Sequence, residues 1–187
     1  MSGETRPIAT GSQTVGPFFH FGLAIHPQWG TLGTENARGE RLRLHVRVLD
    51  GDEAPVPDAL VEIWQADADG RYPPRTPDGP PPPFWGFGRL PTNAEGDCVF
   101  DTIRPGCTEP GSAAHINICL FMRGLLRHLY TRVYFAGDSD LGIDPVLTLV
   151  PAGRRGTLVA APDPASPADW HIDIRLQGEG ETVFFDL

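Results

Sequence analysis

The segment from 41 to 48 alternates strictly between polar and apolar residues, in the order Arg-Leu-Arg-Leu-His-Val-Arg-Val. Successive side chains of a β-strand point to opposite faces of a sheet, so this alternation predicts a strand with one buried face and one wet face. Residues 170–177 alternate in the same way, with Trp, Ile and Leu on one face and His, Asp, Arg and Gln on the other. A dominant period of two, rather than 3.6, favours packed sheets over packed helices.

Short apolar segments separated by turns that contain Gly or Pro continue this pattern. The further predicted strands are 60–65, 98–103, 115–121 and 129–135, and 182–185 could close the sheet. Helix signals are sparse, and the best stretch, 144–160, is interrupted by Pro145, Pro151 and Gly153. The Pro-rich stretch 71–91 is predicted to be a long excursion rather than a strand, and such loops often border binding sites.

Together these signals predict an all-β fold, a single-domain antiparallel β-sandwich with long loops and little helix, over residues 1–187. A chain of 187 residues is long enough for one well-buried domain and too short for two ordinary domains of about 100–150 residues each. Residues 1–40 precede the first predicted strand, and we expect them to form an N-terminal arm.

The charge of the chain restricts its possible functions. The net charge is −9 at pH 7, which argues against nucleic acid as a partner, because phosphate binding needs a basic face. All 15 basic residues are Arg, so Schiff-base chemistry on a lysine is excluded. An anionic substrate would be repelled at long range and would have to be captured by a locally placed arginine.

Cysteine usage and the N-terminal segment indicate a cytoplasmic protein. Cys98, Cys107 and Cys119 form an odd set without a C-x-x-C motif, which predicts reduced thiols rather than a disulfide framework. Residues 1–13 are polar and do not predict a signal peptide. The uncharged stretch 18–34 is broken by glycines and a proline and does not predict a membrane span.

None of the common catalytic motifs is complete in this sequence. The six histidines form no H-x-H or H-E-x-x-H pair, and there is neither a G-x-S-x-G motif nor a Gly-rich phosphate loop. The nearest approach to a metal-ligand pair is His115 with Asn117 on one face of a predicted strand, but a neutral amide oxygen is a poor ligand for iron or zinc. Taken alone, His115 is predicted to be structural. These residues therefore indicate an acidic β-sandwich without a self-sufficient catalytic site.

Six segments, in order and spanning residues 10–187, nevertheless resemble the intradiol dioxygenase family. They are SQTVGPFF (12–19), VEIWQADADGRY (61–72), GFGR (86–89), TIRPG (102–106), AHINICLF (114–121) and DIRLQGEGETVFFD (173–186). One such segment would be a weak signal, whereas six in register are a strong one. The resemblance implies a β-sandwich subunit of an enzyme that cleaves an aromatic ring between adjacent hydroxyls with O2.

In this family a ferric iron is held by two tyrosines and an H-x-H pair of histidines. Residue by residue, the resemblance puts Tyr72 at the first tyrosine position and His115 at the first histidine position. The second tyrosine position falls at Thr108, next to Cys107, and the second histidine position is Asn117. Because two anionic phenolates neutralise the charge of Fe(III), the resemblance implies that this chain binds no metal and that these four positions are vestigial.

The last segment is especially similar to the α chains of a two-chain branch of the family, in which α and β share the fold and only β binds Fe(III). The resemblance therefore implies an α/β hetero-oligomer with an iron-bearing β subunit as partner, which the N-terminal arm, residues 1–40, contacts. It assigns no catalytic residue to this chain, and it implies four substrate-binding residues: Thr14, Gly16, Pro17 and Arg123. The implied reaction converts 3,4-dihydroxybenzoate to 3-carboxy-cis,cis-muconate.

Several alternatives stay open on the sequence alone. Arg123 could be a solvated arginine at the end of a hairpin, and Gly16 with Pro17 could be a simple turn. The chain could also be a self-sufficient dioxygenase that uses Tyr72, His115 and an unexpected donor, which metal analysis of the chain alone would reveal. A non-enzymatic β-sandwich binding or scaffold subunit is the other alternative, and an isolated, stable monomer would favour it.

Overall fold

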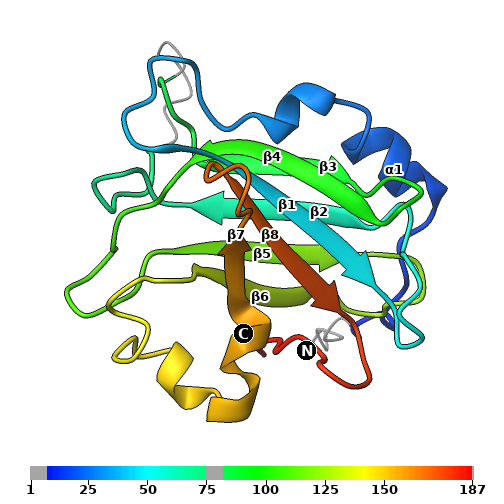
Figure 1. Cartoon of the computed structure of the whole chain (residues 1–187). Coiled ribbons are helices and arrows are strands. Elements are labelled where there is room, and N and C mark those ends of the chain that lie inside the picture. Colours follow the sequence, from blue (N-terminus) through cyan, green and yellow to red (C-terminus); the bar gives the residue numbers. More distant parts are fainter. Residues whose placement is uncertain (1–7, 75–81, 187) are drawn as a thin grey trace, which may run out of the picture.

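The computed structural model describes residues 8–74 and 82–186, and its regular structure is mostly β (Figure 1). The strands are β1 (Arg41–Leu49), β2 (Leu60–Gln65), β3 (Phe87–Pro91), β4 (Asp97–Ile103), β5 (His115–Phe121), β6 (Leu129–Phe135), β7 (Val159–Pro162) and β8 (Asp169–Arg175). The helices are short: α1 (Pro17–Leu23) and the 3-10 helices η1 (Pro27–Gly30), η2 (Leu147–Leu149) and η3 (Ala152–Leu158).

The strands form two layers that are joined through β7. One layer has the order β3-β2-β5-β6, the other has the order β8-β1-β4, and the short β7 pairs with both β6 and β8. The pairings are antiparallel except for β1 with β8 and β6 with β7, which are parallel. The predicted all-β sandwich is confirmed, and its two parallel pairings occur beside β7 and β8, where the chain crosses between the layers.

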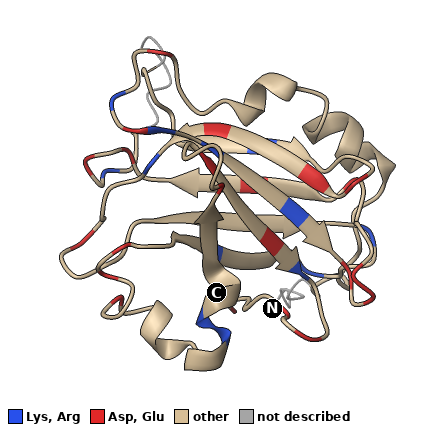
Figure 2. Ribbon diagram, viewed as in Figure 1, with Lys and Arg blue, Asp and Glu red and all other residues tan. Residues whose placement is uncertain are grey.

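The alternation of residues along β1 separates core from surface. Its apolar side chains are buried in the main hydrophobic cluster between the layers. Its polar side chains point outward, and two of them, Arg43 and His45, form hydrogen bonds with Asp169 at the start of β8. Figure 2 shows acidic and basic positions interspersed along β1, β4 and β8, so this outer face is charged without being of one sign.

Most of the predicted strands are confirmed. The bounds of β2, β5 and β6 are those predicted, and β4 and β8 begin one residue earlier than predicted. The prediction for 71–91 is wrong at its end, because Phe87–Pro91 forms the edge strand β3. The stretch 144–160 contains η2, η3 and the start of β7 rather than an α-helix. Residues 182–185 add one isolated bridge, from Phe185 to Tyr130.

Helix α1 lies at the periphery, outside the two layers (Figure 1). Pro17 is its first residue, where the missing N–H of proline costs no hydrogen bond. None of its residues is buried. A helix of seven residues is also too short for a helical period of apolar residues to be recognised in the sequence. Its main contact with the sheet is Phe19, whose ring lies 5.2 Å from the ring of Phe121 at the end of β5.

Within the described ranges, no helix combines the length and the hydropathy that crossing a bilayer requires.

Candidate functional site

The N-terminal arm is fixed to the turn between β5 and β6 by Thr14. Its Oγ1 accepts a hydrogen bond from the backbone N–H of Gly124 at 2.8 Å. Gly124 has a φ of +96°, in the left-handed region where a residue without Cβ is unstrained, and this allows the sharp reversal after β5. Arg123 precedes Gly124, so the contact from Thr14 positions the backbone next to the candidate arginine.

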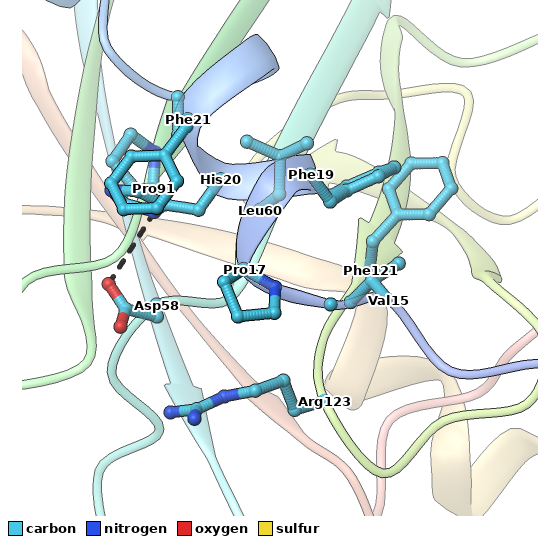
Figure 3. Close-up of a pocket in the computed structure, with 12 residues that line it drawn as sticks. Val15, Pro17, Phe19, His20, Phe21, Asp58, Leu60, Pro91, Phe121 and Arg123 are labelled. Atoms are coloured by element: carbon cyan, nitrogen blue, oxygen red, sulfur yellow. Dashed lines mark ion pairs between the residues drawn. The ribbon is translucent and has the colours of Figure 1, made fainter.

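A pocket of about 150 Å³ lies between the arm, α1 and this turn (Figure 3). Three of the four predicted substrate-binding residues line it, namely Gly16, Pro17 and Arg123, and Thr14 holds the turn just outside. The remaining walls come from α1, the turn before β2, and the ends of β3 and β5: Val15, Phe19, His20, Phe21, Ala24, Asp58, Leu60, Pro91 and Phe121.

Arg123 is exposed, and its guanidinium forms no hydrogen bond or ion pair with the other described residues. Two charged or titratable groups share its pocket, and the sequence did not point to either. These are His20 and Asp58, whose Nδ1 and Oδ1 atoms lie 3.7 Å apart. An arginine without an ion pair to a carboxylate of its own chain can bind an external anion. The negative net charge of the chain calls for such an arginine if the substrate is anionic.

The residues predicted to be vestigial lie at the other end of β5. The Tyr72 hydroxyl accepts a hydrogen bond from Asn117 Nδ2 at 3.0 Å, and the same nitrogen donates to the Trp64 carbonyl at 3.2 Å. The rings of Tyr72 and Trp64 lie 4.7 Å apart. Asn117, on β5, therefore connects Tyr72 to β2 through these two hydrogen bonds. The resemblance implies a histidine at this position in the family.

His115 is buried at the start of β5, and its Nδ1 lies 3.0 Å from the Ala113 carbonyl. Burial lowers the pKa of the imidazole below its usual value, because desolvation disfavours the charged form. The ring packs near Tyr134 on β6, with 5.8 Å between ring centroids. The structural role predicted for His115 alone matches this environment.

We expect His115 to make the stability of the chain depend on pH. Its folded-state pKa is depressed from 6.5, so the unfolded chain binds a proton first and the unfolding free energy falls as the pH drops below about 6.5. One group can contribute at most about 1.4 kcal/mol per pH unit. Urea unfolding between about pH 8 and pH 5 measures this slope. His115→Gln should flatten the slope, whereas His128→Gln, at an exposed position, should leave it unchanged; equal slopes in all three proteins would contradict the assignment.

The position of the second tyrosine lies on a loop that crosses close to the turn before Tyr72. A Cβ on Gly70 would lie 1.9 Å from the Cys107 carbonyl oxygen and 3.5 Å from the Thr108 Cα. The loop with Thr108 therefore approaches the Tyr72 turn, but a threonine stands where a phenolate would be needed. Among residues 8–74 and 82–186, no group of three or more His, Cys, Asp or Glu is arranged to hold a metal. This donor set does not fit Fe(III).

The two groups of predicted residues are separated by the length of one strand. His115 begins β5 and Phe121 ends it, and six steps of ~3.3 Å place the two ends about 20 Å apart. The pocket with Arg123 is therefore not part of the region around Tyr72, His115 and Asn117.

Comparisons with known proteins show what this chain is similar to. A family model described as Dioxygenase matches residues 15–178. The protocatechuate 3,4-dioxygenase alpha chain of Burkholderia cepacia is 43% identical over 192 residues, which cover 95% of this chain and 97% of the relative. The protocatechuate 3,4-dioxygenase beta chain of the same organism is 36% identical over 158 residues, which cover 77% of this chain and 67% of the relative.

A solved structure shows the same fold. The dioxygenase domain of a dioxygenase carbohydrate-binding protein fusion from Streptomyces sp. SirexAA-E superposes with a TM-score of 0.61 at 24% identity, over 90% of this chain and 99% of that one. The residues matched by the family model include both ends of β5 and the pocket beside α1.

Proposed function

Because this chain belongs to the intradiol ring-cleavage dioxygenase family, we propose that it is the α chain of a protocatechuate 3,4-dioxygenase. The assembly cleaves 3,4-dihydroxybenzoate between its hydroxyls with O2 and releases 3-carboxy-cis,cis-muconate. A β chain holds the Fe(III) that activates the substrate, and a β chain is itself a relative of this protein. The present chain contributes a pocket wall and an arginine for the substrate carboxylate.

The observation that carries this proposal is the location of Arg123. It lines a pocket with Gly16 and Pro17, and the residues at the family's iron positions do not line that pocket. A pocket of about 150 Å³ is smaller than the ~300 Å³ at which sites for small ligands usually begin. A second chain that covers its open side would supply both the missing walls and the iron.

Gly16 gives independent support for an approach from outside. Its φ of −109° is accessible to any residue, and an added Cβ would meet nothing within 4 Å in this chain. The fold of this chain therefore does not require a glycine at this position. Close approach of a substrate or of a partner's backbone would require one.

The N-terminal arm, residues 1–40 with 1–7 outside the described part, is the surface that we propose for the β chain. Phe18 is 88% exposed and Phe21 is 63% exposed, although both are large apolar residues. Permanent interfaces typically bury more than about 2,000 Å² and are rich in such side chains. The ending 183–185 is also apolar in sequence, but it offers little apolar surface to a partner, because these residues pack partly against the chain's own two apolar clusters.

Free thiols are compatible with the cytoplasmic location that we propose. Cys98, Cys107 and Cys119 are all unpaired in the structure. Reduced cysteines of this kind are usual in a reducing compartment.

We expect the chain purified without its partner to be colourless and to contain far less than one iron per chain. The reason is that Thr108 and Asn117 replace two ligands, while the Tyr72 hydroxyl is bonded to Asn117. Metal analysis and a visible spectrum measure this directly. The matched measurement is the complex obtained by co-expression with an iron-bearing β chain, which should be coloured and active.

Two outcomes would replace the proposal. A tyrosinate-to-iron charge-transfer band with stoichiometric iron in the isolated chain would make it a self-sufficient dioxygenase. A stable monomer that does not associate with an iron-bearing chain would make it a binding or scaffold protein.

A further inference from the structure

Asp58 occupies the wall of the Arg123 pocket that is formed by the turn before β2. Its backbone has a φ of +60°, in the left-handed region that Asp and Asn tolerate better than other residues with a Cβ. The turn is held by the buried Thr92, whose Oγ1 donates to the Val56 carbonyl at 2.7 Å and accepts from the Ala59 N–H at 2.9 Å. The Asp58 N–H donates to the Thr92 carbonyl at 3.2 Å. The carboxylate is therefore presented to the pocket by a well-defined turn.

The pocket contains three groups that carry or can carry charge. Arg123 comes from the turn after β5, Asp58 from the turn before β2, and its neighbour His20 from α1 (Figure 3). Among the ion pairs of the described residues, none joins Arg123 to Asp58. The two charges therefore act on a bound ligand separately: the guanidinium attracts an anionic group, and the carboxylate repels any negative charge in the pocket.

We propose that Asp58 makes this pocket selective for ligands of low negative charge and thereby favours release of the product. This inference rests on the proposed function. The substrate carries one carboxylate. In the reaction, the bond between the two hydroxyl-bearing carbons breaks, the O–O bond of O2 breaks, each oxygen atom forms a bond to one of these carbons, and two protons leave. The product therefore carries three carboxylates, only one of which the arginine can neutralise.

Repulsion by a fixed charge increases in proportion to the charge of the ligand. As a general scale, one unit charge about 8 Å from another in a water-like dielectric changes a binding constant by roughly twofold. Asp58 is therefore expected to weaken binding of a singly charged substrate about twofold and of a triply charged product about eightfold. An uncharged catechol should be nearly indifferent to it.

The test compares Asp58→Asn with the wild type in the assembled α/β enzyme. Asn accepts the same left-handed backbone, so the turn is retained while the charge is removed. We expect product inhibition to become about eightfold stronger, KM for protocatechuate to fall about twofold, and KM for catechol to change least. Asp58→Gly, which also tolerates this backbone, should give the same order of effects.

Asp52→Asn is the matched control, because Asp52 is an exposed acid on the preceding turn and does not line the pocket. Equal shifts for all three ligands, or no shift in product inhibition for either Asp58 variant, would overturn the inference. If Arg123→Ala loses discrimination for the carboxylate while the Asp58 variants show no graded effect, the role of Asp58 is refuted and the proposed function stands. If neither residue matters, the assignment of the pocket itself fails.

Discussion

Replacement of Asp144 by alanine is expected to lower the unfolding free energy by about 3–5 kcal/mol, the range for breaking a buried charged network. Asp144 is fully buried and accepts hydrogen bonds from three backbone N–H groups, those of Ala113 (2.9 Å), Val146 (3.0 Å) and Leu147 (2.7 Å). It also accepts one from the Tyr134 hydroxyl at 3.0 Å. Burial raises the pKa of Tyr134 to about 12, so the phenol keeps its proton and remains a donor.

The loss is large because alanine would leave all of these buried donors without an acceptor, and each unsatisfied group costs about 1–3 kcal/mol before relaxation. The same carboxylate links the segment before β5, strand β6 and the start of η2, so its removal loosens three parts of the chain together. Urea unfolding followed by circular dichroism measures the change. A loss below about 1 kcal/mol would mean that water or a rearranged loop replaces the carboxylate.

Asp144→Asn removes the charge and keeps one of the two acceptor oxygens, because the amide nitrogen is a donor and cannot accept from a backbone N–H. Burial by itself would raise the pKa of Asp144, but backbone hydrogen bonds, that from Leu147 foremost, hold it below its usual 3.8. The contribution of this depressed pKa to stability is present above about pH 4 and is lost as the pH falls further. Asn should therefore cost less than Ala and should flatten the acid side of the pH profile. An unchanged acid side would show that another group is responsible.

The strands that were predictable from the sequence are those that bury one face. β5 alternates between buried and less buried positions and β2 does so after its first residue, whereas β6 is buried on both faces at its end; all three end at turns, which determine their bounds. β3 was missed because a glycine interrupts its alternation. That glycine, Gly88, packs closely in the structure: a Cβ there would lie 2.6 Å from Leu32 Cδ1 and 3.0 Å from Phe100 Cδ1. Gly88 therefore interrupts the apolar pattern in the sequence and, in the structure, allows β3 to pack closely against Leu32 and Phe100.

The candidate site was predictable only in part, because part of it depends on contacts between segments that are distant in the sequence. Gly16, Pro17 and Arg123 came from the resemblance to a family, and the structure brings them into one pocket. Asp58 and His20 could not be inferred, because their proximity depends on how α1 lies on the sheet. No amphipathic pattern in the sequence predicts that helix. Its large apolar side chains Phe18 and Phe21 stay exposed, so the described part of this chain does not bury them.

Arg123→Ala is expected to lower kcat/KM for protocatechuate in the assembled enzyme by roughly five- to 150-fold. This corresponds to about 1–3 kcal/mol, the range for a charge-assisted contact between a guanidinium and a carboxylate. Catechol has no carboxylate to lose, so its kcat/KM should change much less. Iron content and subunit assembly should remain unchanged, because Arg123 makes no hydrogen bond or ion pair within the described residues and has no part in holding the iron in the proposed arrangement.

Arg127→Ala is the control for a general effect of positive charge. Arg127 is also exposed and belongs to the same connection between β5 and β6, but it does not line the pocket that contains Arg123. A long-range field effect would lower activity similarly in both variants and would weaken with added salt, since charges beyond ~10 Å are screened at 0.1 M ionic strength. A direct contact would confine the loss to Arg123 and to the carboxylated substrate. Equal losses for both substrates would give Arg123 a structural role, and no loss for either would make it a solvated surface residue.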